Sequence, residues 1–227
     1  MKYFLTGLLM LLLSGHVTAG IPEISLEKAP VDRADQKSIE RGAKFFATVC
    51  MACHTLIYLR YDKLAEKAGV TYAKMPVNVK WPQGSVPPDL SLEASARGVD
   101  WIYTYLHSFY QDKARPTGMN NLLVANTMMP GIITAYQGLQ TLATDNRQSE
   151  TINHDWQWYD LLLLKSKGTM DPQKFDATVA DLVNFLAYAS EPYQEQQHRL
   201  GWKVLLFLVI FFIFAYLLKR EYWKDVK

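Results

Sequence analysis

Two apolar stretches, one near each end of the chain, dominate its hydrophobic pattern. The first, residues 4–13, follows the positive charge of Lys2 and precedes small residues at 17–19, a pattern typical of a cleaved secretory signal peptide. The second, residues 204–218, carries no charge and lies within a stretch, 202–222, that would span about 31 Å as a helix. This length matches a bilayer core of about 30 Å, so the sequence predicts one membrane-spanning helix.

Between these ends, the clearest amphipathic pattern covers residues 172–190. Its apolar positions recur at helical spacing and form a single stripe. Asp171 is suited to cap this helix and Pro172 to occupy its first turn, while Glu191-Pro192 ends it. The stripe predicts a helix packed on the core, and it consists of Phe175, Val179, Leu182, Val183 and Leu186.

Shorter segments complete the predicted fold. Residues 38–49 are expected to be helical, and Asp100 is expected to cap a helix that runs to residue 110 with Trp101, Tyr105 and Phe109 on one face. Prolines predict a loop over residues 69–91. Residues 111–131 are also expected to be loop, and residues 139–155 a polar surface excursion. The sequence therefore predicts an all-α domain with long loops, followed by one C-terminal transmembrane helix.

These patterns divide the chain into four parts. We expect a signal peptide at 1–19, a domain outside the cytoplasmic membrane at 20–199, a transmembrane helix at 200–220 and a cytoplasmic tail at 221–227. Basic residues after the span, Lys219, Arg220, Lys224 and Lys227, favour a cytoplasmic C-terminus. The formal net charge is only +2, and no basic run indicates a nucleic-acid partner.

The strongest chemical motif is Cys50-Met51-Ala52-Cys53-His54, a C-x-x-C-H sequence that holds both cysteines of the chain. It is the attachment signature of a c-type haem, in which two thiols bond the porphyrin and the adjacent His ligates the iron. Other interpretations fit less well. A thioredoxin-like motif needs a βαβ context, a zinc site needs about four ligands, and a disulfide here would close a very short loop. The single motif predicts one covalently attached haem c, and export of the domain fits that chemistry.

The second axial ligand determines what the iron does. A Met thioether fills the site and raises the potential, which suits electron transfer, whereas an open site binds small ligands. Met128 and Met129 stand directly before Pro130, which restricts the preceding residue and stiffens the loop. Met129 is the favoured ligand, although the residues alone leave Met128 open. The rivals, each with a weaker setting, are His107, His154, His198, Met75 and Met119.

Several ordered elements resemble the cytochrome c1 family, the haem subunit of the cytochrome bc1 complex, in its bacterial type. Arg41-Gly42 followed by the C-x-x-C-H motif is similar to that family's haem segment. Residues 87–91, Pro-Pro-Asp-Leu-Ser, match a specific element of the family, and Met129-Pro130 matches its axial Met segment. Residues 181–186 and Glu191-Pro192 resemble the element before its membrane anchor. The resemblance covers nearly the whole mature chain.

The resemblance implies particular site residues and partners. Cys50 and Cys53 would hold the haem, His54 and Met129 would ligate iron, Arg97 would face a propionate, and the Pro88 carbonyl would orient the His54 imidazole. The chain would relay single electrons from a Rieske iron–sulfur protein to a c-type cytochrome acceptor, without substrate chemistry of its own. It would do so beside cytochrome b in a dimeric complex of the bacterial inner membrane, with its haem domain in the periplasm.

Two other functions remain open from the sequence. The first alternative is a membrane-anchored cytochrome c of another respiratory complex, such as a terminal oxidase, which would also carry a haem. A haem sensor or enzyme with open iron is the second alternative. Binding of carbon monoxide separates this last class from a Met-ligated relay.

Overall fold

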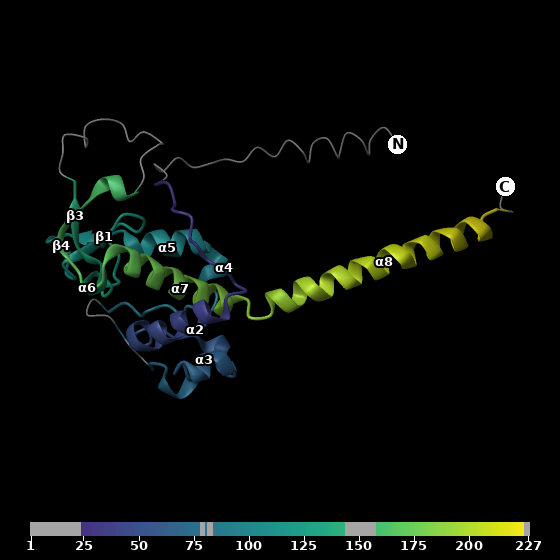
Figure 1. Ribbon diagram of the computed structural model, residues 1–227, viewed down its shortest axis with the longest axis horizontal. Coiled ribbons are helices and arrows are strands. Elements are labelled where there is room, and N and C mark those ends of the chain that lie inside the picture. Colours follow the sequence, from purple (N-terminus) through teal and green to yellow (C-terminus); the bar gives the residue numbers. More distant parts are fainter. Residues whose placement is uncertain (1–23, 78–79, 81–83, 144–157, 225–227) are drawn as a thin grey trace.

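The computed structural model describes residues 24–77, 80, 84–143 and 158–224. The shorter helices gather into one head, and a single long helix, α8, leads away from it (Figure 1). The helices are α2 (Gln36–Phe45), α3 (Lys63–Lys67), α4 (Glu93–Arg97), α5 (Val99–His107), α6 (Thr134–Gln137), α7 (Pro172–Ser190) and α8 (Gln194–Tyr222). The strands are β1 (Phe109–Gln111), β2 (Met119–Asn121), β3 (Gly138–Leu142) and β4 (Leu162–Lys167). One-turn helical segments lie at Phe46–Cys50, Ile57–Leu59, Tyr72–Lys74 and Trp158–Leu161.

The packing of α2 against α7 forms the centre of the head. A Cβ added to Gly42 would lie 1.9 Å from the carbonyl oxygen of Asp181, so the two backbones meet where only glycine fits. Beside this contact the rings of Phe46 and Phe185 lie 5.7 Å apart, and both side chains are fully buried. The prediction that the helix at 172–190 packs on the core is confirmed, and its main partner there is α2, which leads to Cys50.

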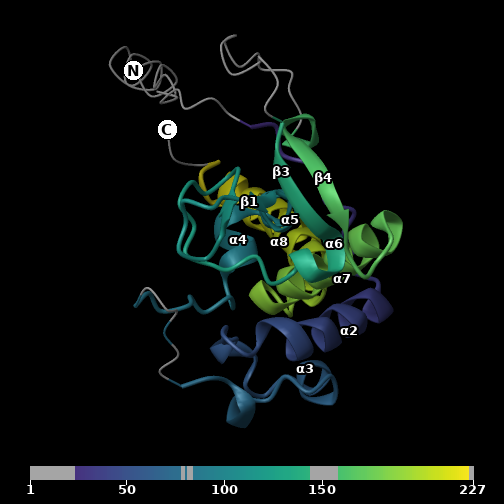
Figure 2. The ribbon, with the colours of Figure 1, turned by 90° about the vertical axis from the view of Figure 1, so that its left-hand side faces the viewer.

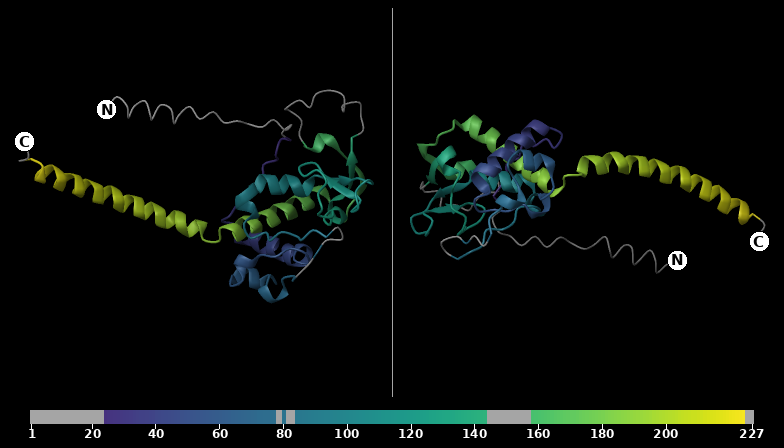
Figure 3. Two further views of the ribbon diagram at one scale, coloured as in Figure 1. Left: turned by 180° about the vertical axis from the view of Figure 1, so that it is seen from behind. Right: turned by 90° about the horizontal axis from the view of Figure 1, so that it is seen from below.

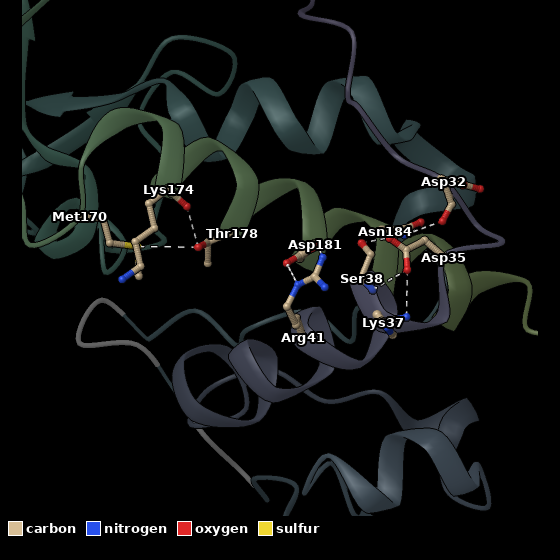
Figure 4. A network of polar contacts seen from close by, with 10 residues as sticks. All are labelled: Asp32, Asp35, Lys37, Ser38, Arg41, Met170, Lys174, Thr178, Asp181 and Asn184. Atoms are coloured by element: carbon tan, nitrogen blue, oxygen red, sulfur yellow. Dashed lines mark hydrogen bonds and ion pairs between the residues drawn. The ribbon is translucent and has the colours of Figure 1, made fainter.

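Polar contacts along the same pair of helices set the position of one helix relative to the other (Figure 4). The Arg41 guanidinium donates to both carboxylate oxygens of Asp181, at 2.6 and 2.7 Å. Further along, the Asn184 side chain donates to the Asp32 carbonyl at 2.6 Å and to Ser38 Oγ at 3.0 Å. A two-pronged Arg–carboxylate pair is directional, so it adds register to an interface whose energy comes mainly from apolar burial.

Helix α7 has the predicted bounds. The Asp171 carboxylate accepts a hydrogen bond from the backbone N–H of Lys174 at 2.9 Å, as an N-cap does. Pro172 occupies the first position. All five residues of the predicted stripe are buried at no more than 4% exposure. Here the cap and the apolar spacing agree, which is why the sequence prediction was correct.

The prediction of an all-α domain was wrong in part, because the head also contains two small antiparallel sheets. Strand β1 pairs with β2, and β3 pairs with β4, which Figure 2 shows as a two-stranded ribbon beside α6 and α7. Strand β2 lies in the segment expected to be loop at 111–131, and most of β3 lies at the start of the polar excursion expected at 139–155, of which residues 144–155 are outside the described residues. The helix predicted to run to residue 110 ends at His107 instead, and Phe109 belongs to β1. Strands of three to six residues carry too few positions for an alternating pattern to reveal them.

The start of one helix also differs from the prediction. Helix α5 begins at Val99 after Gly98, whose φ of 89° only glycine adopts readily, so Asp100 is not the cap. The Asp100 carboxylate accepts instead from the backbone N–H of Ala29 at 2.9 Å and from Lys28 Nζ at 3.1 Å. It therefore secures the N-terminal segment to the head.

Helix α8 is the one helix among the described residues that is long and apolar enough to cross a membrane, over residues 196–222 (Figure 3). Only residues 191–193 separate it from α7. At this joint Arg33 Nη1 donates to a Glu191 carboxylate oxygen at 2.7 Å and contacts the Gln194 side chain. The predicted signal peptide at 1–19 lies outside the described residues.

The Gly42 contact generates a stability prediction. In Gly42→Ala the new methyl group overlaps the Asp181 carbonyl, so α2 and α7 must separate. We expect the free energy of unfolding to fall by about 3 kcal/mol or more. Denaturant unfolding of the purified protein measures this loss. Gly201→Ala, which meets no atom within 4 Å, is the matched control and should leave the stability of the head unchanged.

Candidate haem site

The cysteine motif begins at the end of a wider helical turn that follows α2. Helix α2 continues without a break into a π-helical turn, Phe46–Cys50, and the backbone N–H groups of Cys53 and His54 both point back to the Cys50 carbonyl, at 3.1 and 2.9 Å. Such turns are rare and occur often at functional sites. The turn directs Cys50 inward, where it is 8% exposed, and leaves Cys53 half-buried.

A largely apolar cavity of about 330 Å³ lies next to this turn. It brings together residues that are far apart in the sequence. Of the predicted site residues, Cys53 alone is not among those lining the wall. The predicted site residues that line the cavity are Cys50, His54, Pro88, Arg97, Met128 and Met129. The apolar wall includes Phe46, Leu90, Trp101, Ile102, Leu106, Leu182 and Leu186.

The His54 imidazole is oriented by a backbone carbonyl. Its Nδ1 lies 2.8 Å from the carbonyl oxygen of Pro88, so Nδ1 carries the proton and Nε2 is the nitrogen suited to bind a metal. Burial lowers the pKa of His54, which favours the neutral imidazole that a metal requires. The contact expected between these two residues is therefore present, while the role of His54 as an iron ligand stays a prediction.

Asp89, next to Pro88, holds the segments on both sides of the imidazole. Its carboxylate accepts hydrogen bonds from Thr55 Oγ1 at 2.6 Å and from the backbone N–H groups of Ile57 and Ser91, at 3.0 and 2.9 Å. Burial by itself raises the pKa of Asp89, but the hydrogen bonds from Ser91, Thr55 and Ile57 outweigh it and lower the pKa below its usual value. This carboxylate therefore joins the residues that follow the C-x-x-C-H motif to the loop that carries Pro88.

Arg97 lies on the cavity wall, but it already has partners. Its Nε contacts the Glu93 carboxylate one turn earlier on α4, and its guanidinium lies 4.4 Å from the centroid of the Trp101 ring. The side chain is 50% exposed. The remaining guanidinium N–H groups stand at the rim of the cavity, where a carboxylate of a bound group could reach them.

The two methionines line the cavity from a loop of residues 122–129, and hydrogen bonds from side chains outside this loop hold it in place. Thr127 Oγ1 lies 2.9 Å from the hydroxyl of Tyr105 on α5. Asn120 Oδ1 accepts from the backbone N–H of Asn126 at 2.8 Å. Asn126 is in the left-handed region, at φ 62°. The sequence pattern does not single out Asn120 and Asn126, because a polar pair and a lone Asn in a loop give no periodic signal.

The rival ligands do not reach the cavity in the part of the chain that the structure describes. His107 is buried, with Nδ1 2.8 Å from the Tyr103 carbonyl and Nε2 3.2 Å from the Asp176 carboxylate. Met75 and Met119 are buried elsewhere, and none of these three lines the cavity. His198 is exposed on α8, and His154 lies outside the described residues.

The donor groups of the cavity fit a haem. Apolar walls suit a porphyrin, and an imidazole and a thioether are the axial pair typical of electron-transfer haems. Burial raises the pKa of the Cys50 thiol to about 12, which favours the neutral thiol over the thiolate. A paired-cysteine motif beside such a cavity, in a helical head, defines a c-type cytochrome.

Comparison with known proteins narrows this class. The chain belongs to the cytochrome c1 family, whose model matches residues 26–81 and 71–226. It is 39% identical to cytochrome c1 of Allochromatium vinosum, over 99% of both chains. It is 28% identical to cytochrome c1 of Rhodospirillum rubrum, over 86% of this chain and 84% of that one. A protein named ammonia monooxygenase gamma subunit, from Nitrosomonas europaea, is 36% identical over 99% and 98% of the two chains. The resemblance inferred from the motifs is confirmed.

Asp89 generates a prediction about acid stability. Because its pKa is lowered in the folded protein, its stabilising effect is present above the unfolded pKa of about 3.9 and is lost as the pH falls through the folded value. We expect Asp89→Asn to destabilise the protein by about 2 kcal/mol at neutral pH, since a charged acceptor of three hydrogen bonds is lost.

Chemical unfolding at several pH values between about 5 and 2 checks this assignment. The variant should lose less stability over that range than the native protein does. Glu66→Gln, at an exposed position on α3, is the matched control. An equal pH dependence in native protein and Asp89→Asn would contradict the assignment.

Proposed function

We propose that this chain is the haem-bearing subunit of a cytochrome bc1 complex and relays single electrons from a Rieske iron–sulfur protein to a c-type cytochrome acceptor. The observation that carries this proposal is the cavity itself, which unites the cysteine motif, an oriented imidazole and a methionine loop in a member of the cytochrome c1 family. The apolar helix α8 is consistent with membrane anchoring. The chain performs no bond-making on a substrate.

Each predicted site residue has a role in this proposal. Cys50 and Cys53 attach one haem c, which when bound supplies a one-electron couple. His54 provides the nitrogen ligand, oriented by the Pro88 carbonyl, and Met129 provides the sulfur ligand. A methionine that fills the second position excludes small ligands and favours the reduced state.

Arg97 is proposed to neutralise a haem propionate. It lies at the rim of the cavity and its guanidinium is already aligned by Glu93 and Trp101. A carboxylate placed against a low-dielectric wall needs a partner of opposite charge. Because a guanidinium has several donors, Arg97 is able to keep the Glu93 contact and still bind the propionate.

The proposed placement follows the charge pattern at the ends of the chain. The signal peptide, 1–19, is removed on export, the haem domain, 20–199, lies in the periplasm, and the helix at 200–220 crosses the inner membrane. The tail, 221–227, is cytoplasmic, because Lys219, Arg220, Lys224 and Lys227 follow the span. Cytochrome b and the Rieske protein are the proposed partners, in a dimeric complex.

Replacing the proposed sulfur ligand tests the site directly. In Met129→Leu we expect a lower midpoint potential and loss of the weak far-red absorption band that Met-ligated ferric haem gives, because the thioether no longer binds the iron. Carbon monoxide should then bind the ferrous protein rapidly. Met75→Leu, at a buried position away from the cavity, is the control and should match the native protein. An unchanged potential in Met129→Leu would reject this ligand.

Potentiometric titration of the membrane-bound haem, combined with quinol–cytochrome c turnover, tests the function as a whole. A positive midpoint potential, slow carbon monoxide binding and turnover that Met129→Leu abolishes are expected. Rapid carbon monoxide binding by the native protein would instead indicate a sensor or enzyme with open iron. Normal Met ligation without quinol-driven reduction would indicate the anchored cytochrome of another respiratory complex, such as a terminal oxidase.

A further inference from the structure

Two adjacent methionines line the cavity, and iron has room for one of them. Met128 and Met129 both contribute to the wall, so access to the cavity does not explain which sulfur binds. Their surroundings differ. Met129 packs against the apolar core, whereas the sulfur of Met128 contacts a charged side chain from another segment.

That side chain is Arg115, from the turn between β1 and β2. Its Nη2 donates to the Asn126 carbonyl at 3.0 Å and lies 3.9 Å from Met128 Sδ. The turn fixes the backbone of Arg115, since its N–H donates to the Asp112 carbonyl at 3.1 Å and its carbonyl accepts from Gly118 at 2.9 Å. The guanidinium therefore extends to the methionine loop from a backbone position that the turn holds in place.

The guanidinium is enclosed rather than solvated at its inner end. Arg115 Nε is buried and has no hydrogen-bond partner among the described residues. A buried donor without a partner is costly, and natural proteins keep few of them. The contacts of Nη2 with Asn126 and Met128 offset part of that cost.

The same contacts determine where the loop turns. Asn126 has a φ of 62°, the one positive φ among the described non-glycine residues. Its N–H is bound by Asn120 Oδ1 at 2.8 Å and its carbonyl by Arg115. With both sides of this strained residue held, the path of the chain into Thr127 and Met128 is set.

We propose that Arg115 is a positioning residue that selects Met129 over Met128 as the sulfur ligand of the haem iron. The inference rests on the proposed function, in which a methionine closes the second axial position. A thioether that accepts from a guanidinium has its lone pair directed toward a cation, so it is less available to iron, which is also cationic. Meanwhile Met129 stays directed by the core and by the Asn126 turn.

The test uses the full-length holoprotein with Arg115→Leu. Removing a charge-assisted contact should shift the ratio of Met128-bound to Met129-bound haem roughly ten-fold toward Met128. Proton NMR of the ferrous protein resolves the two states, because the methyl group of a ligating methionine lies over the haem and gives its own strongly shifted signal. We expect one such signal in the native protein, two in Arg115→Leu, and a midpoint potential altered by the mixture.

A second substitution separates ligand selection from simple loosening of the loop. In Arg115→Leu/Met128→Leu the competing sulfur is gone, so one methionine signal and the native potential should return. Two outcomes would overturn the proposal: an unchanged single signal in Arg115→Leu, or a lost signal that Met128→Leu does not restore. Lys113→Leu, at an exposed position of the same turn, is the matched control.

Two further variants keep the result interpretable. If Arg115→Leu fails to fold, Arg115→Lys retains the charge without the planar guanidinium and should give the same two signals to a smaller extent. A single signal in that variant would count against selection by Arg115. Met129→Leu tests the proposed function separately: if it keeps the native methionine signal, the ligand assignment itself fails, whatever Arg115 does.

Discussion

The close contact between Gly42 and the Asp181 carbonyl is the constraint on which the rest of the head depends. It lets α2 and α7 approach until their side chains interlock, and both helices then contribute to the same wall. Phe46 and Cys50 reach the cavity from the end of α2, and Leu182 and Leu186 reach it from α7. A wider separation of the helices would therefore change the shape of the cofactor site as well as the stability of the protein.

The remainder of the site is assembled from irregular chain that side chains hold in place. Asp89 joins the cysteine motif to the loop carrying Pro88, and Asn120 and Arg115 fix the methionine loop. Each of these groups bonds at least one backbone atom of the loop that it holds. Such bonds replace the regular hydrogen bonding that loops lack, so a long loop is able to present a ligand in one orientation.

The sequence predicted those parts of the structure whose signals are local. An N-cap residue and an apolar stripe predicted helix α7, and the C-x-x-C-H motif predicted covalent attachment of a haem. Asp100 was misassigned because an acidic residue at a helix start looks like a cap, while its real partner, Ala29, is distant in the sequence. The short strands were missed because three to six residues carry no readable alternation. Arg115 was missed because its role comes from its contacts with Asn126 and Met128 in the folded chain, and residue type and spacing do not record such contacts.

The joint between head and anchor has a mechanical consequence. Only residues 191–193 connect α7 to α8, and Arg33 bonds both Glu191 and Gln194 across that joint. A tether this short, braced by the opposite end of the chain, leaves the head little freedom to tilt on its anchor. Electron tunnelling falls off steeply with distance, so in the proposed complex this short joint would act as a spacer that sets one height for the haem above the lipid surface. A mobile electron acceptor would then have to come to that height, because the joint would not let the head swing toward it.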